Sequence, residues 1–218
     1  MKQEGSVLEF ALRKDTYLWH SDESRGTLRK VLQVLRQYEA DYPYRYGMKK
    51  AEVQMTFFKK TKPAVFDKIV DYYISQGEIK RVDEFLCTPE YEVRKDDVYE
   101  KVSSGFLKAW KQAGFDFVRY TELEHKAVSD QVADDILNIL LEEKQAVKVS
   151  DDMYTLTEYM EEAKDKIKEH LKEDPVITIA QVRDMFGTSR KSAKPILEYM
   201  DSIKVTKKTG AESERVAY

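Results

Sequence analysis

Apolar residues recur at spacings of three and four over several stretches of the chain, the pattern of a helix with one buried face. Two such stretches, Leu28 to Tyr38 and Val98 to Trp110, predict long amphipathic helices. Ser129 is suited to cap a third helix, and a charged helix is predicted from about Glu158 to Lys172. Short runs rich in β-branched and aromatic residues follow the helices and predict hairpins. The pattern therefore predicts a mainly α protein with small β-hairpins, an α+β fold.

The segment from Thr178 to Asp201 predicts a helix-turn-helix. Thr178 is suited to cap a short first helix, because its hydroxyl can accept a hydrogen bond from the backbone of the first turn. Gly187 supplies the turn, since glycine adopts a positive φ at little steric cost. Thr188 or Ser189 then caps the second helix. Two strands with a turn between them are predicted after it, at 203–208 and 214–218, and the whole module is therefore predicted to be a winged helix.

The same plan recurs along the chain with a period of about 60 residues, which predicts tandem winged-helix domains. Four parts follow from this repeat: a hairpin at 1–23, read as the wing remnant of a preceding module, and winged helices at 24–95, 96–157 and 158–218.

Each repeat contains a predicted hairpin. The hairpins are placed at 6–20, at 78–82 with 91–94, and at 146–149 with 153–156. Tyr17, Tyr91 and Tyr154 then share the second strand of each hairpin, which favours a common register. The module at 96–157 has a weak middle helix near Thr121 to His125.

Charge distinguishes the modules from one another. The whole chain has 37 Lys and Arg against 40 Asp and Glu, so nucleic-acid binding requires a local patch. Between Arg183 and Lys208 seven cations face three acidic residues. The helix from Ser129 to Glu143 has five acidic residues and no cation, which favours a spacer or a protein contact. The corresponding helix of the module at 24–95 is neutral, with Lys62 and Lys68 opposed by Asp67 and Asp71.

The basic region of the last module is the candidate nucleic-acid site. Arginine suits bidentate contact with phosphate, whereas lysine acts as a point charge. The alternative interpretation is an ordinary solvated helix start, and Arg183 also has Asp184 beside it as a local ion-pair partner. The candidate RNA-binding residues are Arg183, Thr188, Ser189, Arg190, Lys191, Lys194, Lys207, Lys208 and Arg215.

The sequence offers no catalytic, metal or cofactor site. The three histidines, His20, His125 and His170, lie in different modules without metal-ligand spacing, and Cys87 is the single cysteine. The chain has no G-x-x-x-x-G-K-[ST] phosphate-binding loop, so it is not expected to be an enzyme of that kind. It also lacks the roughly 20 consecutive apolar residues of a membrane span, which favours a cytoplasmic protein.

Several segments resemble the bacterial selenocysteine-specific elongation factors of the SelB family. The segments 177–184, 187–191, 197–201 and 205–208 resemble the last winged helix of that family. The run Tyr42-Pro43-Tyr44-Arg45-Tyr46-Gly47-Met48 is similar to the family's Asn-Pro-Leu-Arg-x-Gly-Met segment in an earlier winged helix.

The resemblance implies a C-terminal fragment whose last winged helix binds the SECIS hairpin of an mRNA. The GTPase and tRNA-binding domains of the family lie upstream of this region. Arg190, Lys191, Lys207 and Lys208 would hold loop-region phosphates, because an A-form major groove is too narrow for a helix. Looped-out bases would enter a pocket beside the helix start. The expected partners are an mRNA stem-loop and, for the full-length factor, the ribosome, with the chain itself a monomer.

Two other function classes fit the same fold. A tandem winged-helix transcription regulator would bind duplex DNA, although the acidic helix at 129–143 argues against a base-reading face in that module. A protein-interaction scaffold of stacked winged helices would leave the basic patch as a solvated surface.

Overall fold

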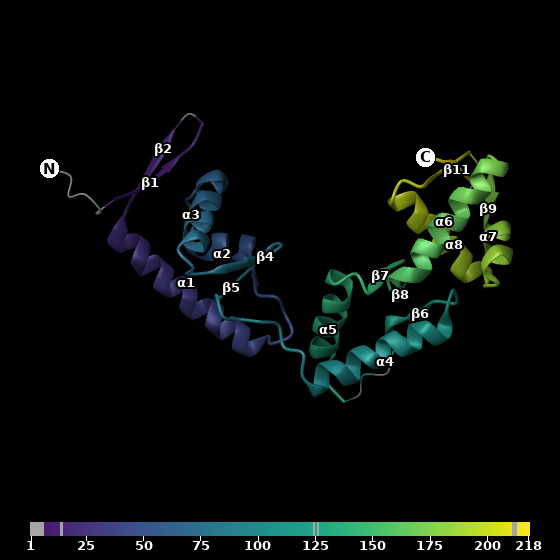
Figure 1. The fold of residues 1–218 in the computed structure, drawn as a ribbon, viewed down its shortest axis with the longest axis horizontal. Helices are drawn as coiled ribbons and strands as arrows, with labels where there is room; N and C mark the ends of the chain where they lie inside the picture. The colour runs from purple at the N-terminus through teal and green to yellow at the C-terminus, as the bar shows by residue number, and fades with distance from the viewer. Residues whose placement is uncertain (1–6, 14, 124, 126, 211–212) are drawn as a thin grey trace. The chain divides into compact units, whose positions relative to one another are not determined.

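A computed structural model describes residues 7–13, 15–123, 125, 127–210 and 213–218. Five residues inside the predicted elements lie outside this description: Ser6, Lys14, Glu124, Ala211 and Glu212. The structure divides into two compact units, Met1–Lys95 and Asp96–Tyr218 (Figure 1). The finer division into four parts, with boundaries at 23, 95 and 157, stays a prediction.

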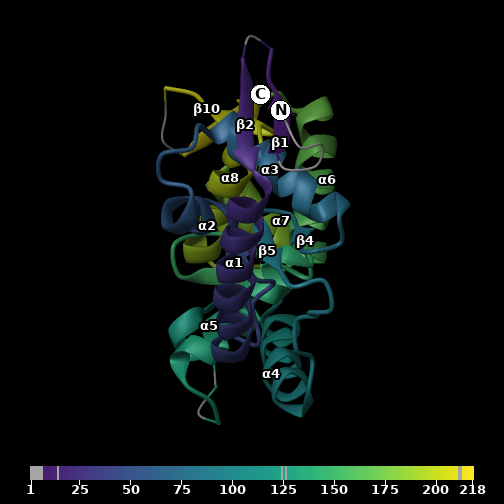
Figure 2. The ribbon, with the colours of Figure 1, turned by 90° about the vertical axis from the view of Figure 1, so that its left-hand side faces the viewer.

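The first unit begins with the expected hairpin. Strands β1 (Val7–Ala11) and β2 (Thr16–His20) pair antiparallel, and both ribbon views place them at the N-terminal end of helix α1 (Ser21–Asp41) (Figures 1 and 2). One face of the hairpin joins the core of the following helices. Phe10 is 7% exposed, and the Trp19 and Phe58 rings meet edge to face with centroids 5.9 Å apart. The hairpin is therefore packed into the first unit.

A winged helix follows in the same unit. Helices α2 (Lys50–Phe57) and α3 (Pro63–Ser75) form its helix-turn-helix, and Pro63 occupies the first helical position, where its missing N–H costs nothing. The wing is a three-stranded sheet in the order β3-β5-β4: Met48–Lys49, Phe85–Cys87 and Lys80–Val82.

The return strand of this wing is not where the sequence predicted it. The prediction of a strand at 91–94, with Tyr91 in the hairpin, is wrong, because β4 turns directly into β5 through Asp83 and Glu84. Asp83 adopts a φ of 49°, which aspartate tolerates better than most residues. A two-residue turn without glycine is a weak sequence signal. Tyr17 and Tyr154 do lie in second strands, β2 and β8.

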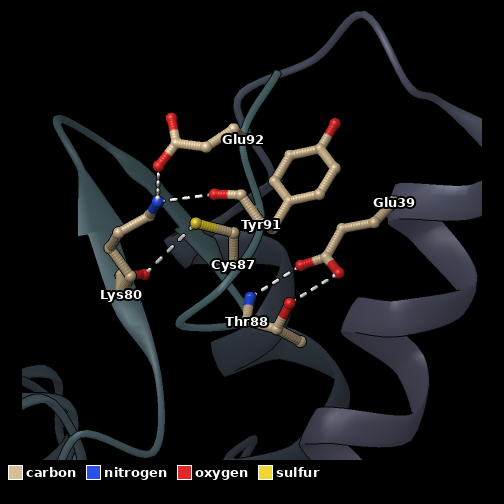
Figure 3. A network of polar contacts seen from close by, with 6 residues as sticks. All are labelled: Glu39, Lys80, Cys87, Thr88, Tyr91 and Glu92. Carbon is tan, nitrogen blue, oxygen red and sulfur yellow. Dashed lines mark hydrogen bonds and ion pairs between the residues drawn. The ribbon is translucent and has the colours of Figure 1, made fainter. Parts of the chain in front are cut away.

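Polar contacts hold the segment after β5 against helix α1 (Figure 3). The Glu39 carboxylate accepts hydrogen bonds from the Thr88 backbone N–H at 2.6 Å and the Thr88 hydroxyl at 2.9 Å. Lys80 Nζ donates to the Tyr91 carbonyl and the Glu92 carboxylate. Cys87 is fully buried beside them, and burial raises the pKa of its thiol to about 11. This burial fits a structural cysteine.

The second unit begins with a module of similar plan. Asp96 caps α4 (Asp97–Ala113), and Ser129 caps α5 (Asp130–Glu142) as predicted. Near 121–125, where a weak helix was predicted, the described residues form a single 3-10 turn, Tyr120–Glu122. The sheet of this module has the order β6-β8-β7: Val118–Arg119, Met153–Leu156 and Ala146–Lys148.

The last module completes the second unit. Helix α6 (Thr157–Glu173) leads into strand β9 (Ile177–Thr178), helix α7 (Ile179–Phe186) and helix α8 (Arg190–Ser202). Strands β10 (Thr206–Lys208) and β11 (Glu214–Ala217) form the wing with β9, in the order β10-β11-β9. Each of the three-stranded sheets thus includes a two-residue strand that the sequence did not predict: β3, β6 or β9.

Candidate nucleic-acid interface

The helix-turn-helix of the last module forms through local contacts that the sequence predicted. The Thr178 hydroxyl accepts a hydrogen bond from the Gln181 N–H at 3.2 Å, and the Gln181 side chain accepts one from the Thr178 N–H at 2.8 Å. This reciprocal pair is a capping box. Gly187 ends α7 with a φ of 58°, and Ser189 caps α8 through the Ser192 N–H. The α7–α8 turn is therefore closely defined.

Burial fixes which side of α8 faces solvent. Ala193, Ile196, Leu197 and Met200 are fully buried against α6 and α7. Ser192 and Pro195 are buried as well, and the exposed cations of α8 are Arg190, Lys191 and Lys194.

The exposed cations form two groups. Arg190 and Lys191, the helix-start cations, lie in the first turn of α8. Lys204, Lys207 and Lys208, the wing cations, lie on and before β10. A surface hollow beside the wing cations is lined by residues from the far end of α8, among them Asp201 and Ser202. Arg190 and Asp201 are eleven residues apart, which is about 16 Å of helix, so the two groups flank α8 at opposite ends.

Ion pairs leave most of these cations uncompensated. Arg183 is engaged by its neighbour Asp184 at 2.6 Å, as the sequence suggested, and Lys194 Nζ lies 3.7 Å from the Glu198 carboxylate. Among the residues that the structure describes, Arg190, Lys191 and Lys208 have no ion-pair partner. The unpaired charges are thus at the helix start and on the wing.

Arg215 requires a correction. Its guanidinium was predicted to add to the binding surface, but the residue is 1% exposed. Its Nε donates to Asp201 Oδ2 at 2.7 Å, while the Thr206 hydroxyl donates to Asp201 Oδ1 at 2.7 Å. Arg215 therefore joins β11 to the end of α8, and it does not belong to the exposed cations.

Thr188 and Ser189 are tied to the preceding module within the same unit. The Thr188 hydroxyl lies 2.8 Å from the Phe115 carbonyl oxygen and 2.5 Å from Asp116 Oδ1. The Ser189 N–H donates to the same Asp116 oxygen at 3.2 Å. Below them the Phe115 and Phe186 rings pack with centroids 4.4 Å apart. A carboxylate from the preceding module thus occupies the start of α8.

Sequence reasoning missed Tyr218. Its side chain is 65% exposed, and the ammonium groups of Lys204 and Lys207 lie 5.8 Å and 5.9 Å from its ring centroid. An exposed aromatic ring beside cations is the arrangement on which bases of single-stranded nucleic acid stack. The sequence signal for Tyr218 was its position directly after the second wing strand, whose partner strand carries Lys207 and Lys208.

The module at 24–95 places its tyrosines differently. Tyr44 is buried, and the Arg45 guanidinium lies 4.1 Å from the Tyr42 ring centroid and bonds to the Tyr38 hydroxyl at 3.0 Å. These contacts form within the module.

The described residues also bear on metal and membrane sites. They include no group of three or more His, Cys, Asp or Glu side chains placed to hold a metal ion. Across the same residues, none of the helices is both long and apolar enough to cross a bilayer.

Comparison with known proteins finds similarity in two segments of the chain and over its length. Residues 169–213 and residues 32–86 each match a family model described as an elongation factor SelB winged helix. A selenocysteine-specific elongation factor of Desulfomicrobium baculatum is 24% identical over 208 residues, which is 94% of this chain and 33% of that protein. The chain thus spans about a third of the length of this relative.

Two solved structures match this chain. The bacterial selenocysteine-specific elongation factor EF-Sec matches 99% of this chain and 32% of its own, with a TM-score of 0.50 and 18% identity. The mRNA-binding domain of Escherichia coli elongation factor SelB, in complex with SECIS RNA, matches 56% of this chain and 98% of its own, with a TM-score of 0.46 and 21% identity. In this chain residues 32–86 and 169–213 are thus the two segments that match winged helices of elongation factor SelB.

Proposed function

We propose that the last winged helix binds a hairpin of mRNA, and that the chain is the RNA-tethering arm of a selenocysteine-specific elongation factor. The observation that carries the proposal is the pair of unpaired cation groups flanking α8 in a SelB-type module. The mRNA-binding domain of SelB from Escherichia coli is named as a complex with SECIS RNA, the kind of partner we propose for this chain.

The geometry suggests how the two groups share the RNA. The helix-start cations and the wing cations contact phosphates at two points about 16 Å apart along α8. A looped-out base stacks on Tyr218, beside the wing cations. This replaces the base pocket expected beside the helix start. Arg183, Thr188, Ser189 and Lys194 are left with supporting roles, because each already has a partner inside the protein.

The rest of the factor follows from the same proposal. GTP hydrolysis and tRNA binding belong to other domains of a full-length factor, and this chain contributes no catalytic step. The factor acts in the cytoplasm on the ribosome, and this arm is monomeric. The acidic α5 helix spaces the RNA site from the ribosome-facing body.

Substituting the helix-start cations tests the proposal. We expect Arg190→Ala/Lys191→Ala to lower affinity for a cognate mRNA hairpin by about tenfold to a hundredfold, since each lost arginine contact costs about 1–3 kcal/mol. Fluorescence anisotropy at two salt concentrations measures this against a panel of stem-loops and matched duplex DNA. Lys168→Ala/Lys172→Ala on α6 is the matched control, with the same charge change in the same module.

The outcomes separate the three function classes. Tight hairpin binding that the double variant loses, with little DNA affinity, supports the proposal. Equal or tighter binding of duplex DNA would make the chain a DNA-binding regulator. Binding to neither would leave a protein-interaction scaffold and contradict the proposal.

Removing the charge of Asp116 is expected to have the opposite effect. Asparagine keeps an oxygen that accepts from the Thr188 hydroxyl and the Ser189 N–H, but it carries no charge to repel a phosphate at the start of α8. A charge pair at 4 Å is worth about 1 kcal/mol in water, so Asp116→Asn should raise hairpin affinity about two- to fivefold. The exposed Asp151→Asn is the control. Unchanged affinity for Asp116→Asn would place the RNA phosphates away from the helix start.

A further inference from the structure

The first winged helix presents a second set of cations at the turn before its second helix. Lys59 and Lys60 lie between α2 and α3, Lys62 is the residue just before α3, and Lys68 lies six residues further along that helix, about 9 Å from Lys62. All four lysines, the α3 lysines, are exposed. They occupy the same part of a winged helix as the helix-start cations do in the last module.

The turn that carries these lysines is held in place by the core. Phe58 is 6% exposed, and its ring packs on Phe66 of α3 with centroids 5.0 Å apart. The Thr61 N–H donates to the Phe58 carbonyl at 2.9 Å, and Gln54 of α2 reaches the Thr61 carbonyl at 3.4 Å. The lysine stems therefore project from an ordered backbone.

The sequence made this surface look neutral, and the structure changes that interpretation. Asp67 and Asp71 on α3 were taken to cancel Lys62 and Lys68. In the structure Asp67 accepts from Lys50 at 2.8 Å, and Asp71 lies 3.6 Å from Arg81 of β4. Both carboxylates are thus engaged by cations from other elements.

Most of the α3 lysines remain uncompensated. Lys62 has a long, exposed ion pair with Asp15 at 3.5 Å, which contributes little in water. Within the described part of the chain, Lys59, Lys60 and Lys68 have no ion-pair partner. From Lys50 to Ser75 five lysines stand against three acidic residues, so a local positive excess remains.

We infer that the α3 lysines form a second RNA-binding surface, one that holds the phosphate backbone of an RNA helix without reading its sequence. Ammonium groups on flexible stems act as point charges and suit phosphates. The choice of RNA over another polyanion rests on the proposed function of the last module. A chain with two such surfaces binds its specific hairpin through the last module and any structured RNA through the first winged helix.

The test separates this surface from the hairpin site. In the full chain we substitute Lys59→Gln/Lys60→Gln/Lys68→Gln and measure binding to an RNA duplex of arbitrary sequence over a range of salt concentrations. Each phosphate contact contributes about 0.9 to the slope of log affinity against log salt, so the slope should fall by about two to three. Affinity for the duplex at low salt should fall at least about tenfold. The preference for the cognate hairpin over other stem-loops should stay unchanged.

A charge-matched variant controls for net charge. Arg29→Gln/Lys30→Gln/Arg36→Gln removes three exposed cations from α1 of the same unit. An equal loss in both triple variants, or no loss in the α3 variant, would overturn the inference. Because all substituted residues are exposed, both variants should keep the parent melting temperature within a few degrees. Loss of hairpin preference in Arg190→Ala/Lys191→Ala is a separate result that tests the last module alone.

Discussion

Arg215→Ala should lower the free energy of unfolding by about 3 kcal/mol. The substitution removes one member of a buried ion pair and leaves Asp201 with the Thr206 hydroxyl as its remaining polar contact. Breaking a buried pair by truncating one partner costs about 3–5 kcal/mol, and the lower end applies because the Asp201 side chain is 22% exposed. Urea unfolding followed by circular dichroism measures the loss.

Two further variants identify the cause. Arg215→Met keeps much of the side-chain volume without the charge, so a similar loss would show that the ion pair matters more than packing. Lys208 is the exposed cross-strand neighbour of Arg215. Lys208→Ala should therefore alter the free energy of unfolding by less than about 0.5 kcal/mol. If Arg215→Ala were fully stable and yet lost RNA binding, Arg215 would be an RNA contact as its position in the sequence first suggested.

The local features of the last module were predictable from the sequence because they depend on near neighbours. The Thr178 cap, the Gly187 turn and the Ser189 cap each form through contacts within four residues. The hydrophobic pattern likewise predicted the long helices, since burial of one face imposes a period of 3.6 residues. The Ser129 cap of α5 was also predicted correctly, because it too forms with a residue three positions away.

Side-chain contacts between residues far apart in the sequence were not predictable from such local patterns. Asp116 meets Ser189 across 73 residues of sequence, and Arg81 reaches Asp71 from a strand beyond the helix. A charge count along one segment cannot include such partners. It therefore assigned Arg215 to the surface and made the second helix of the first module look neutral.

The short strands show a related limit. Strands β3, β6 and β9 have two residues each, too few for an alternating pattern to be visible. Each exists because a neighbouring wing strand offers unpaired backbone groups beside it. The wing hairpins were predicted in part from composition, but their third strands follow only from the packed helices.

Gly47→Ala should be the most damaging single substitution in the first unit, with a loss of at least about 3 kcal/mol. Gly47 has a φ of 138°, a conformation that residues with a side chain rarely adopt. A Cβ atom there would clash with the backbone carbonyl oxygen of Leu86, which no side-chain rotation can relieve. Strained backbone alone costs about 1–3 kcal/mol, and overpacking adds to it.

The chain around Gly47 is held by its neighbours, so it cannot move aside to relieve the clash. The next residue, Met48, pairs with Leu86 across β3 and β5, so moving the chain away would break that pairing. The Tyr91 hydroxyl also donates to the carbonyls of Pro43 and Arg45 in the same segment. This gives a physical reason for glycine in the segment 42–48 that resembles the family motif.

A second glycine in the same unit is the control for Gly47→Ala. Gly26 lies in helix α1, and a Cβ atom there meets nothing within 4 Å. Gly26→Ala should therefore raise the free energy of unfolding by about 0.5–1 kcal/mol, because alanine restricts the unfolded chain and favours helix. Urea unfolding compares both variants with the parent. If Gly47→Ala were as stable as Gly26→Ala, the close approach of 42–48 to β5 would not exist in solution, and the first wing would need a different pairing.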